Sequence, residues 1–470
     1  MKAFISKNRN FIFCCVIIAS VYLLDSLLFF SQFYLMYDFY SEKTINAVST
    51  GWAYLAQGAG LGMFMLLYKT RSRLSARRVF QVLLFLIEVP VIIVSILIPG
   101  RILLMFMIVL LNIIIGLHTG FTFTLAAAHA PTSRLGLCYG LAYAVGAFGT
   151  WLISEISGGV MTSYRIIFAD SLIIALIVVL ILVYRDAFEN GRDGENASTD
   201  ALPAAAGSSP DTAGSRKILI LLCLVIAIMA PISSIGTNNN LYVEYSREFV
   251  LLAQRSFYAV GLIAAGLIFD KNRIIGGICA VVSLIYPIVL IMIYQESGLV
   301  MPVIGMSYVI LGFFAVYRAA SFMTLAAESK KLQLAPLGLA VARVCEAVSV
   351  LAIIEIGCDE LASVILVSVL FIPLVILFFL MIKEQYTPSA AAAEAPRELS
   401  ADERRAAFAE QYGLTRREEE IAMFLSEGRS NGEIAELLQL SENTVRFHVS
   451  NILKKTGMKD RNEVSRAYRQ

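Results

Sequence analysis

Residues with the chemistry to read a DNA duplex lie together near the C-terminus of the chain. Arg446 could bond a guanine edge or a phosphate, and Phe447 could contact a thymine methyl group. Lys454, Lys455 and Lys459 are better placed for phosphate contacts, which position a protein on DNA without reading bases. These residues predict a DNA-binding surface, provided that a helix presents them together.

Local capping signals predict the helices that would hold this surface. The expected helices span 401–411, 416–427, 431–438, 442–456 and 461–469. Capping boxes, in which a cap residue is followed three positions later by Glu, begin at Ser400, Thr415, Ser430 and Asp460. A three-residue turn, Gln439–Ser441, joins the third helix to the fourth. Two short helices joined in this way form a helix-turn-helix.

The apolar pattern of these two helices predicts which face is free. The inward residues are Ile434, Ala435 and Leu438 of the first helix and Val445, Val449 and Ile452 of the second. The outer face of the second helix then carries Arg446, Phe447, Ser450, Asn451 and Lys454. A plain helical bundle with a solvated face is the alternative. Acidic residues gather in 418–442 and basic residues in 446–469, which favours a DNA-facing side.

The residue pattern resembles the LuxR-type DNA-binding domain over about 60 residues. The matching segments are L414-T-R-R-E-E-E-I, G428-R-S-N-G-E-I-A-E-L-L, L440-S-E-N-T-V-R-F-H-V-S-N-I-L-K-K-T-G-M and R461-N-E-V. The resemblance implies a helix-turn-helix at about Asn431–Ser450 that binds double-stranded DNA. The expected DNA-contact set is Asn431, Thr444, Arg446, Phe447, Ser450, Asn451, Lys454 and Lys455.

The same resemblance implies dimerisation through the last helix, 461–469. Its expected contact residues are Val464, Ala467 and Tyr468, and a homodimer would read two half-sites. Two residues of the recognition helix depart from the family's usual pattern. Phe447 replaces a small or β-branched residue, and Ser450 replaces a common lysine. The operator sequence of the family therefore does not transfer to this chain.

The rest of the chain is strongly apolar. The 470 residues are 58% hydrophobic and 16% charged, against roughly 25% charged in soluble domains. Charged residues make up about 12% of residues 1–382 and about 33% of residues 383–470. This composition excludes a disordered chain, a coiled coil and a small disulfide-stapled domain. It predicts a membrane domain followed by a soluble one.

Twelve apolar runs are long enough to cross a bilayer as helices. They lie near 11–36, 47–68, 79–98, 102–126, 136–157, 165–184, 217–237, 251–269, 274–294, 299–322, 336–357 and 361–382. The predicted domains are a first six-helix half at 1–184, a cytoplasmic linker at 185–216, a second half at 217–382, a linker at 383–407 and the DNA-binding domain at 408–470.

Lysine and arginine distribution predicts the orientation in the membrane. The N-terminus and alternate loops hold 18 of these residues, and the opposite loops hold 5. Because the more basic loops face the cytoplasm, both termini are expected on the cytoplasmic side of a bacterial inner membrane.

The layout resembles the major facilitator superfamily, which is built from two parallel repeats of six helices. Thr124-Leu125-Ala126-Ala127 and Thr324-Leu325-Ala326-Ala327 recur at an offset of 200 residues, which supports a duplication. The family's basic loop between spans two and three is matched only at Arg77-Arg78; its Gly and Asp are missing. The expected fold is all-α: a twelve-helix transmembrane bundle of 6+6 helices and a C-terminal domain of four to five helices.

Ionisable residues inside the spans are the candidates for a ligand site, because they are costly in hydrocarbon and normally face the bundle interior. The expected cavity residues are His118, Arg318, Arg343 and Glu346, and the expected ligand is an unknown small-molecule signal. The alternative is that these residues form structural pairs or reach the bilayer interface. Arg343 and Glu346 are three residues apart, so they could pair on one helix.

The sequence has no metal-binding spacing, phosphate-binding glycine loop or nucleophile elbow, so we expect neither an enzyme nor a cofactor. The expected function is membrane-bound transcriptional regulation, with the membrane domain as sensor and the bilayer and DNA as partners. Two alternatives remain open. One is a transporter whose DNA-binding tail regulates its own gene, and the other is an inert membrane anchor for a regulator.

Overall fold

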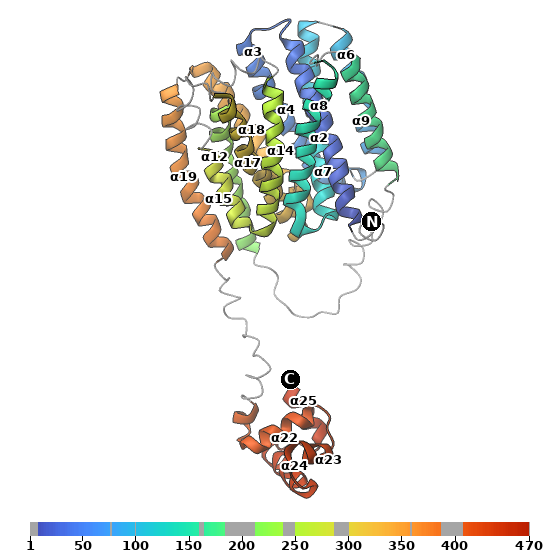
Figure 1. The fold of residues 1–470 in the computed structure, drawn as a ribbon, viewed down its shortest axis with the longest axis vertical. Helices are drawn as coiled ribbons and strands as arrows, with labels where there is room; N and C mark the ends of the chain where they lie inside the picture. Colours follow the sequence, from blue (N-terminus) through green and yellow to red (C-terminus); the bar gives the residue numbers. More distant parts are fainter. Residues whose placement is uncertain are drawn as a thin grey trace. The chain divides into compact units, whose positions relative to one another are not determined.

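The computed structural model describes residues 8–75, 78–98, 100–158, 164–183, 212–237, 250–285, 300–357, 360–386 and 408–469. The chain divides into two compact units, Met1–Thr387 and Pro388–Gln470. Figure 1 shows a helical bundle in the first unit and a small helical domain in the second. All secondary structure in the described residues is helical, as expected for an all-α fold.

The first unit consists of two sets of helices. The first set is α2 (Arg9–Met36), α3 (Glu42–Asn46), η1 (Ala47–Trp52), α4 (Ala53–Ser75), α5 (Arg78–Leu86), α6 (Glu88–Leu97), α7 (Arg101–His129), η2 (Thr132–Arg134), α8 (Leu135–Ile156) and α9 (Tyr164–Val183). The second set is α12 (Thr212–Thr237), α14 (Val250–Lys271), α15 (Arg273–Ser283), α17 (Val300–Glu328), η3 (Leu332–Leu334), α18 (Leu337–Ile356) and α19 (Glu360–Tyr386).

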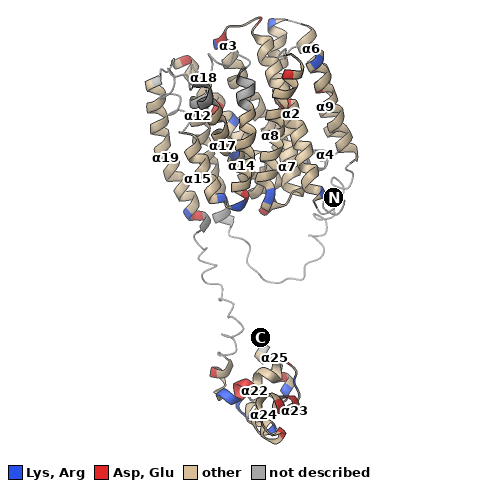
Figure 2. Cartoon of the chain, in the orientation of Figure 1, with Lys and Arg blue, Asp and Glu red and all other residues tan. Residues whose placement is uncertain are grey.

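Long apolar helices account for most of the expected spans. Within the described residues, nine helical stretches are long and apolar enough to cross a membrane. The helices α4, α14 and α15 lie where the other three spans are predicted. The described part of the ninth span ends at Ile285, so the rest of the prediction at 274–294 lies outside the described residues. Figure 2 shows charged residues mainly at the two ends of the bundle, as a bilayer requires.

The two halves repeat one local arrangement. In the first half, the 29-residue helix α7 is followed by the 3₁₀ turn η2 and by α8. In the second half, the 29-residue helix α17 is followed by the 3₁₀ turn η3 and by α18. This agreement between distant segments supports the duplication that the sequence repeat suggests.

Small residues allow the halves to approach closely. The helix α8 of the first half packs along α14 of the second, and α4 packs along α18. A Cβ atom added at Gly140 in α8 would overlap the carbonyl oxygen of Leu262 in α14. Such close backbone contact is typical of membrane helices, where packing replaces the hydrophobic drive.

The second unit has its own hydrophobic core. It contains α22 (Arg416–Ser426), α23 (Asn431–Leu438), α24 (Glu442–Thr456) and α25 (Arg461–Arg469). Residues 408–411 are helical, and residues 401–407 of the first expected helix lie outside the described residues. The fully buried core residues include Ile421, Ile434, Val445, Ile452 and Val464. Because this core is made within the unit, the domain can be tested as a separate fragment.

Candidate DNA-binding surface and membrane cavity

Side-chain caps define the helix-turn-helix. Ser430 and Glu433 form a complete capping box at the start of α23. Gln439, with φ 52°, ends that helix in the left-handed conformation, which reverses the chain sharply. The Ser441 hydroxyl then accepts a hydrogen bond from the Thr444 backbone N–H, 3.1 Å away, and caps α24. The turn is therefore set by local hydrogen bonds.

One face of α24 is open to solvent. Val445 and Ile452 are fully buried on the inner face. Arg446 and Phe447 are each 63% exposed on the outer face, where Arg446 Nη2 lies 2.7 Å from Glu442 Oε1. Arg446 and Phe447 therefore form an exposed pair next to each other on the open face of α24.

The structure brings most of the predicted DNA-contact residues onto α24. Ser450 and Lys454 are exposed, and Asn451 is half-buried. The Thr444 hydroxyl lies 2.7 Å from the Ser441 hydroxyl, so it takes part in the helix cap. Asn431 lies at the first turn of α23, where its Oδ1 accepts a 3.5 Å hydrogen bond from Arg461.

Lys455 has a different environment from the one predicted. Its ammonium group donates hydrogen bonds to Glu418 Oε2 at 2.6 Å and to the Gly413 carbonyl at 2.9 Å. It therefore ties α24 to the start of α22 and is not free for phosphate. Burial raises the pKa of the Glu418 carboxyl, but hydrogen bonds from Lys455 and Thr415 outweigh it, so the pKa lies below its ordinary value.

We expect Glu418→Gln to destabilise the C-terminal domain by about 1–2 kcal/mol at neutral pH, because it weakens the capping box and removes the partner of Lys455. The lowered pKa of Glu418 means that its contribution is complete above the ordinary value of 4.5 and is lost as the pH falls through the folded pKa. Urea unfolding of residues 388–470 between neutral and acidic pH measures this. As a control, Glu436→Gln at an exposed position should give the same dependence of unfolding free energy on pH as the parent domain. If Glu418→Gln also gives the parent's dependence, Glu418 does not stabilise the domain in this way.

The predicted dimerisation residues lie in the domain core. Val464 is fully buried, Tyr468 is 6% exposed and Ala467 packs against the same core. The Tyr468 ring meets the Phe408 ring edge-on with centroids 5.2 Å apart. The expectation that these side chains contact a partner is therefore wrong for this conformation, because the apolar face of α25 is needed inside its own domain. The exposed face of α25 carries Asn462, Glu463 and Arg466.

In the membrane unit, a cavity of ≈ 90 Å³ lies between the two halves. Its lining comes from α2, α4, α7 and α8 of the first half and from α17 and α18 of the second. The lining residues are Tyr22, Asp25, Ser26, Phe29, Tyr54, Gln57, Ile115, Thr119, Tyr139, Tyr143, Arg318, Leu339 and Arg343. Its walls are therefore aromatic, with charged groups from both halves.

Two arginines share one carboxylate beside this cavity. Arg318 Nη1 lies 2.5 Å from Glu346 Oε1, and Arg343 Nη1 lies 3.0 Å from Glu346 Oε2. The side chains of Arg318 and Glu346 are each 7% exposed. The structure thus brings three of the four predicted cavity residues together.

His118 lies in a separate cluster, contrary to the prediction. Its Nδ1 lies 3.0 Å from Glu88 Oε1, and both side chains are completely buried. The Phe85 ring stacks on the imidazole with centroids 3.8 Å apart. His118 is absent from the cavity lining because it faces α5 and α6 of its own half. Arg318, which occupies the matching position in the repeat, lines the cavity between the halves.

The predicted cavity set left out Asp25 and the tyrosines that complete the cavity wall. Tyr139 and Tyr143 are four residues apart on α8, so their spacing placed them on one face. Tyr22 stacks on Tyr143 with centroids 4.4 Å apart, and its hydroxyl lies 3.0 Å from that of Tyr139. Asp25 could be noticed in the sequence as an acidic residue within an apolar run. No local pattern, however, linked it to the arginines.

A second missed residue, Asp270, joins the two halves at the end of the bundle where α8 begins. Asp270 of α14 accepts hydrogen bonds from the backbone N–H groups of Gly136, at 2.8 Å, and Leu137, at 2.7 Å. The first turn of a helix has free N–H groups and attracts negative charge. Asp270 therefore caps α8 across the interface.

We expect Asp270→Asn to lower the stability of the membrane unit by about 0.5–2 kcal/mol, because the amide has one acceptor oxygen and no charge. Thermal unfolding of the detergent-purified protein measures the change. Asp38→Asn, at an exposed turn after α2, serves as the control. Equal midpoints for both variants would show that this cap contributes nothing.

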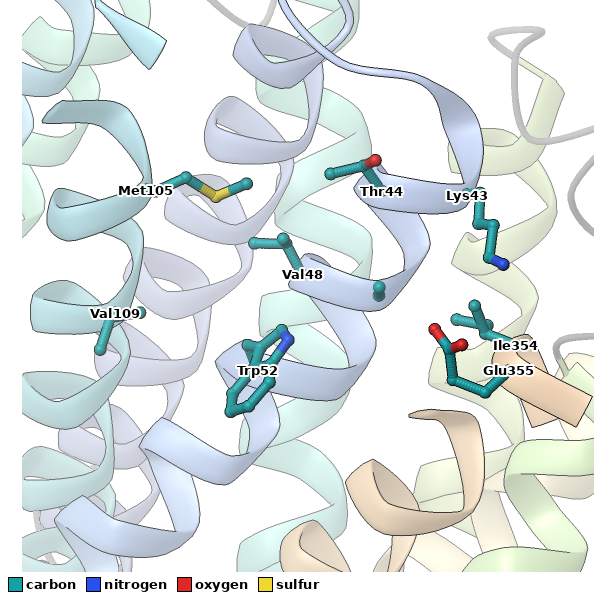
Figure 3. A pocket seen from close by; sticks show the side chains of 9 residues that line it. Lys43, Thr44, Val48, Trp52, Met105, Val109, Ile354 and Glu355 are labelled. Carbon is teal, nitrogen blue, oxygen red and sulfur yellow. The ribbon is translucent and has the colours of Figure 1, made fainter. Parts of the chain in front are cut away.

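A larger, more open pocket of ≈ 420 Å³ lies at another place between the halves. Figure 3 shows Met105 and Val109 on one side of Trp52 and the charged ends of Lys43 and Glu355 on the other. Trp52 ends the π-helical turn η1 and is 55% exposed. An exposed tryptophan near a lysine is typical of the bilayer interface, so this pocket is a weaker ligand candidate than the cavity lined by Arg318 and Arg343.

The two units resemble different groups of known proteins. Residues 413–467 match the family of bacterial regulatory proteins called the luxR family. The uncharacterized transcriptional regulatory protein YhcZ of Bacillus subtilis is 46% identical over 54 residues, 12% of this chain and 25% of that protein. The regulatory protein SdiA of Escherichia coli is 38% identical over 55 residues, 12% of this chain and 23% of that protein. The match thus spans about a quarter of these relatives.

Solved transporter structures resemble the membrane unit. The human organic anion transporter MFSD10 aligns with a TM-score of 0.54 and 14% identity, over 79% of this chain and 99% of the transporter. A POT family transporter in complex with 5-aminolevulinic acid aligns with a TM-score of 0.52 and 13% identity, over 79% of this chain and 96% of that chain. At such low identity the likeness shows the fold alone. The protein is therefore a multi-pass membrane protein with a major-facilitator-like fold and a C-terminal LuxR-type helix-turn-helix domain at residues 413–467.

Proposed function

We propose that the protein is a membrane-bound bacterial transcriptional regulator that binds specific DNA through α24. The observation that carries this proposal is the solvent-exposed pair Arg446 and Phe447 on a capped recognition helix, within a domain that matches regulators. Such a helix enters the major groove with its N-terminal part against the base edges. A homodimer on two half-sites is part of the proposal, with an interface other than the buried face of α25.

We further propose that the membrane unit senses a small molecule in the cavity between the halves. The ligand would favour one arrangement of the halves and so change DNA access or dimerisation of the tail. The polar residues of the cavity lined by Arg318 and Arg343 support this idea, and the basic loops support cytoplasmic termini.

Chromatin immunoprecipitation with the tagged full-length protein tests the proposed function. We expect enrichment of a small set of promoters that share a two-part site, and loss of this enrichment in Arg446→Ala. Uniform recovery of DNA with both proteins would contradict specific regulation. To test sensing, the DNA affinity of the full-length protein is compared with that of residues 388–470 in the presence of cell extracts. A ligand effect should appear only in the full-length protein.

The alternative is a transporter with an autoregulatory DNA-binding tail. It is favoured by the alignment of nearly the whole length of solved transporters with the membrane unit. Substrate uptake into vesicles that is abolished by Arg318→Gln or Glu346→Gln would support transport. Uptake equal to that of empty vesicles, together with ligand-dependent DNA binding, would leave the sensor as the function.

A further inference from the structure

The charges of Arg318, Arg343 and Glu346, beside the cavity, do not balance. Arg318 and Arg343 carry two positive charges, and both are bonded to the single carboxylate of Glu346. A guanidinium group stays protonated in proteins. This group of three residues therefore has one positive charge in excess, in surroundings where an uncompensated charge is costly. Asp25, which lines the same cavity, cancels that charge only when it is ionised.

Buried polar atoms of the cavity lining also lack partners. Within the described residues, the Nε atoms of Arg318 and Arg343 and the Oδ1 atom of Asp25 are buried without a hydrogen-bond partner. All three residues line the cavity. Buried polar groups are normally paired, so each unpaired atom requires an explanation. The arginines need an acceptor, and Asp25 needs a donor.

Aromatic rings lie against both arginines. The guanidinium carbon of Arg343 lies 3.9 Å from the centroid of the Tyr54 ring. That of Arg318 lies 5.0 Å from the Phe314 ring. Stacked arginines lose little entropy when they bind, because their planar donors are already oriented. The site is therefore built before a ligand arrives.

We infer that this cavity binds a small organic monocarboxylate that carries a hydrogen-bond donor at its other end. The carboxylate lies against Arg318 and Arg343, and the donor lies against Asp25. With Asp25 protonated, one negative charge balances the excess positive charge, whereas a doubly charged phosphate would overshoot it. With Asp25 ionised, a neutral amino acid with one carboxylate and one ammonium group keeps the balance. An ammonium donor suits an ionised Asp25, and a hydroxyl donor suits a protonated one. This inference rests on the proposed sensor role of the cavity and names the chemical class of its ligand.

The test uses matched compounds on the purified full-length protein. The probes are ω-amino and ω-hydroxy acids of about two to six carbons, a size set by the cavity volume of ≈ 90 Å³. The plain acids and plain amines of equal length are the controls. Thermal shift and calorimetry measure binding. We expect at least one amino or hydroxy acid to bind about tenfold or more tightly than its plain acid, and the plain amine to bind weakest.

Two variants test the assigned contacts. Arg343→Gln leaves a neutral Arg318–Glu346 pair, so the protein should remain folded while affinity for the acids falls about tenfold or more. Asp25→Asn should remove the preference for ω-amino acids over plain acids of equal length. Arg165→Gln, at an exposed position of α9, should change neither. If no probe binds, or if binding is unchanged in Arg343→Gln and Asp25→Asn, the inference is overturned.

The outcome also separates this inference from the proposed function. If the acids bind as expected but the DNA affinity of the full-length protein does not change, the ligand class stands and the sensor proposal fails. If another class of compound changes DNA affinity and the acids do not bind, the sensor proposal stands and the ligand class is wrong.

Discussion

Glu346→Gln is expected to destabilise the membrane unit by about 3–5 kcal/mol, because it leaves two arginines without their shared carboxylate. Removing one partner of a buried ion pair costs more than the pair contributes, since the desolvation of the remaining charge is no longer offset. Thermal unfolding of the full-length protein in detergent, with the C-terminal domain followed separately, measures this loss.

The matched control is Glu355→Gln, which changes an exposed carboxylate on the same helix, α18. It should leave the unfolding midpoint unchanged. The double variant Arg318→Gln/Glu346→Gln removes one of the two unpaired charges, so it should recover part of the stability that Glu346→Gln loses. A Glu346→Gln protein as stable as the parent would mean that both arginines reach water, and the cavity charge argument would then fail.

The second large effect is expected at the DNA-binding face. Arg446→Ala should weaken specific DNA binding by about 1–3 kcal/mol at fixed salt and relax the preference for one base position, because a guanine contact is lost. Arg446 is 63% exposed, and its single ion pair to Glu442 is within one turn of α24. The substitution should therefore leave the domain folded.

Arg416→Ala is the control for this measurement. Arg416 begins α22, its side chain is 94% exposed and it lies outside the helix-turn-helix. Binding is measured by fluorescence anisotropy with promoter fragments from the immunoprecipitation, over a series of salt concentrations. If Arg446→Ala keeps the same preference for specific over random DNA as Arg416→Ala, α24 is not the helix that reads the bases.

Local signals made the C-terminal helices predictable. The bounds of α23 and α24 coincide with the expected 431–438 and 442–456. The reason is that capping boxes and the helical period act within a few residues, so they can be read along the chain. The Asp460 cap departs in detail. Its Oδ1 accepts from the Glu463 N–H, but the Glu463 carboxylate bonds the Lys459 N–H instead of closing the box.

The contacts of single side chains were harder to predict, because they depend on how helices rotate and pack. His118 and Arg318 occupy matching places in the repeat, yet one pairs with Glu88 inside its half and the other lines the cavity. Tyr468 shows the same limit. An apolar face on the last helix can serve a partner or the domain's own core, and only packing shows which side is covered.

The sequence by itself determined the classes of structure in this protein: apolar runs of bilayer length, a polar tail and a capped helix-turn-helix. These features depend on hydropathy and on local hydrogen bonds, which involve residues that are close together in the sequence. The tertiary structure alone decided that Asp25, Arg318 and Arg343, from three helices, meet at one cavity and that Asp270 caps α8. Such contacts depend on how helices that are far apart in sequence pack against each other. Close backbone contact and the pairing of buried charges favour one packing arrangement.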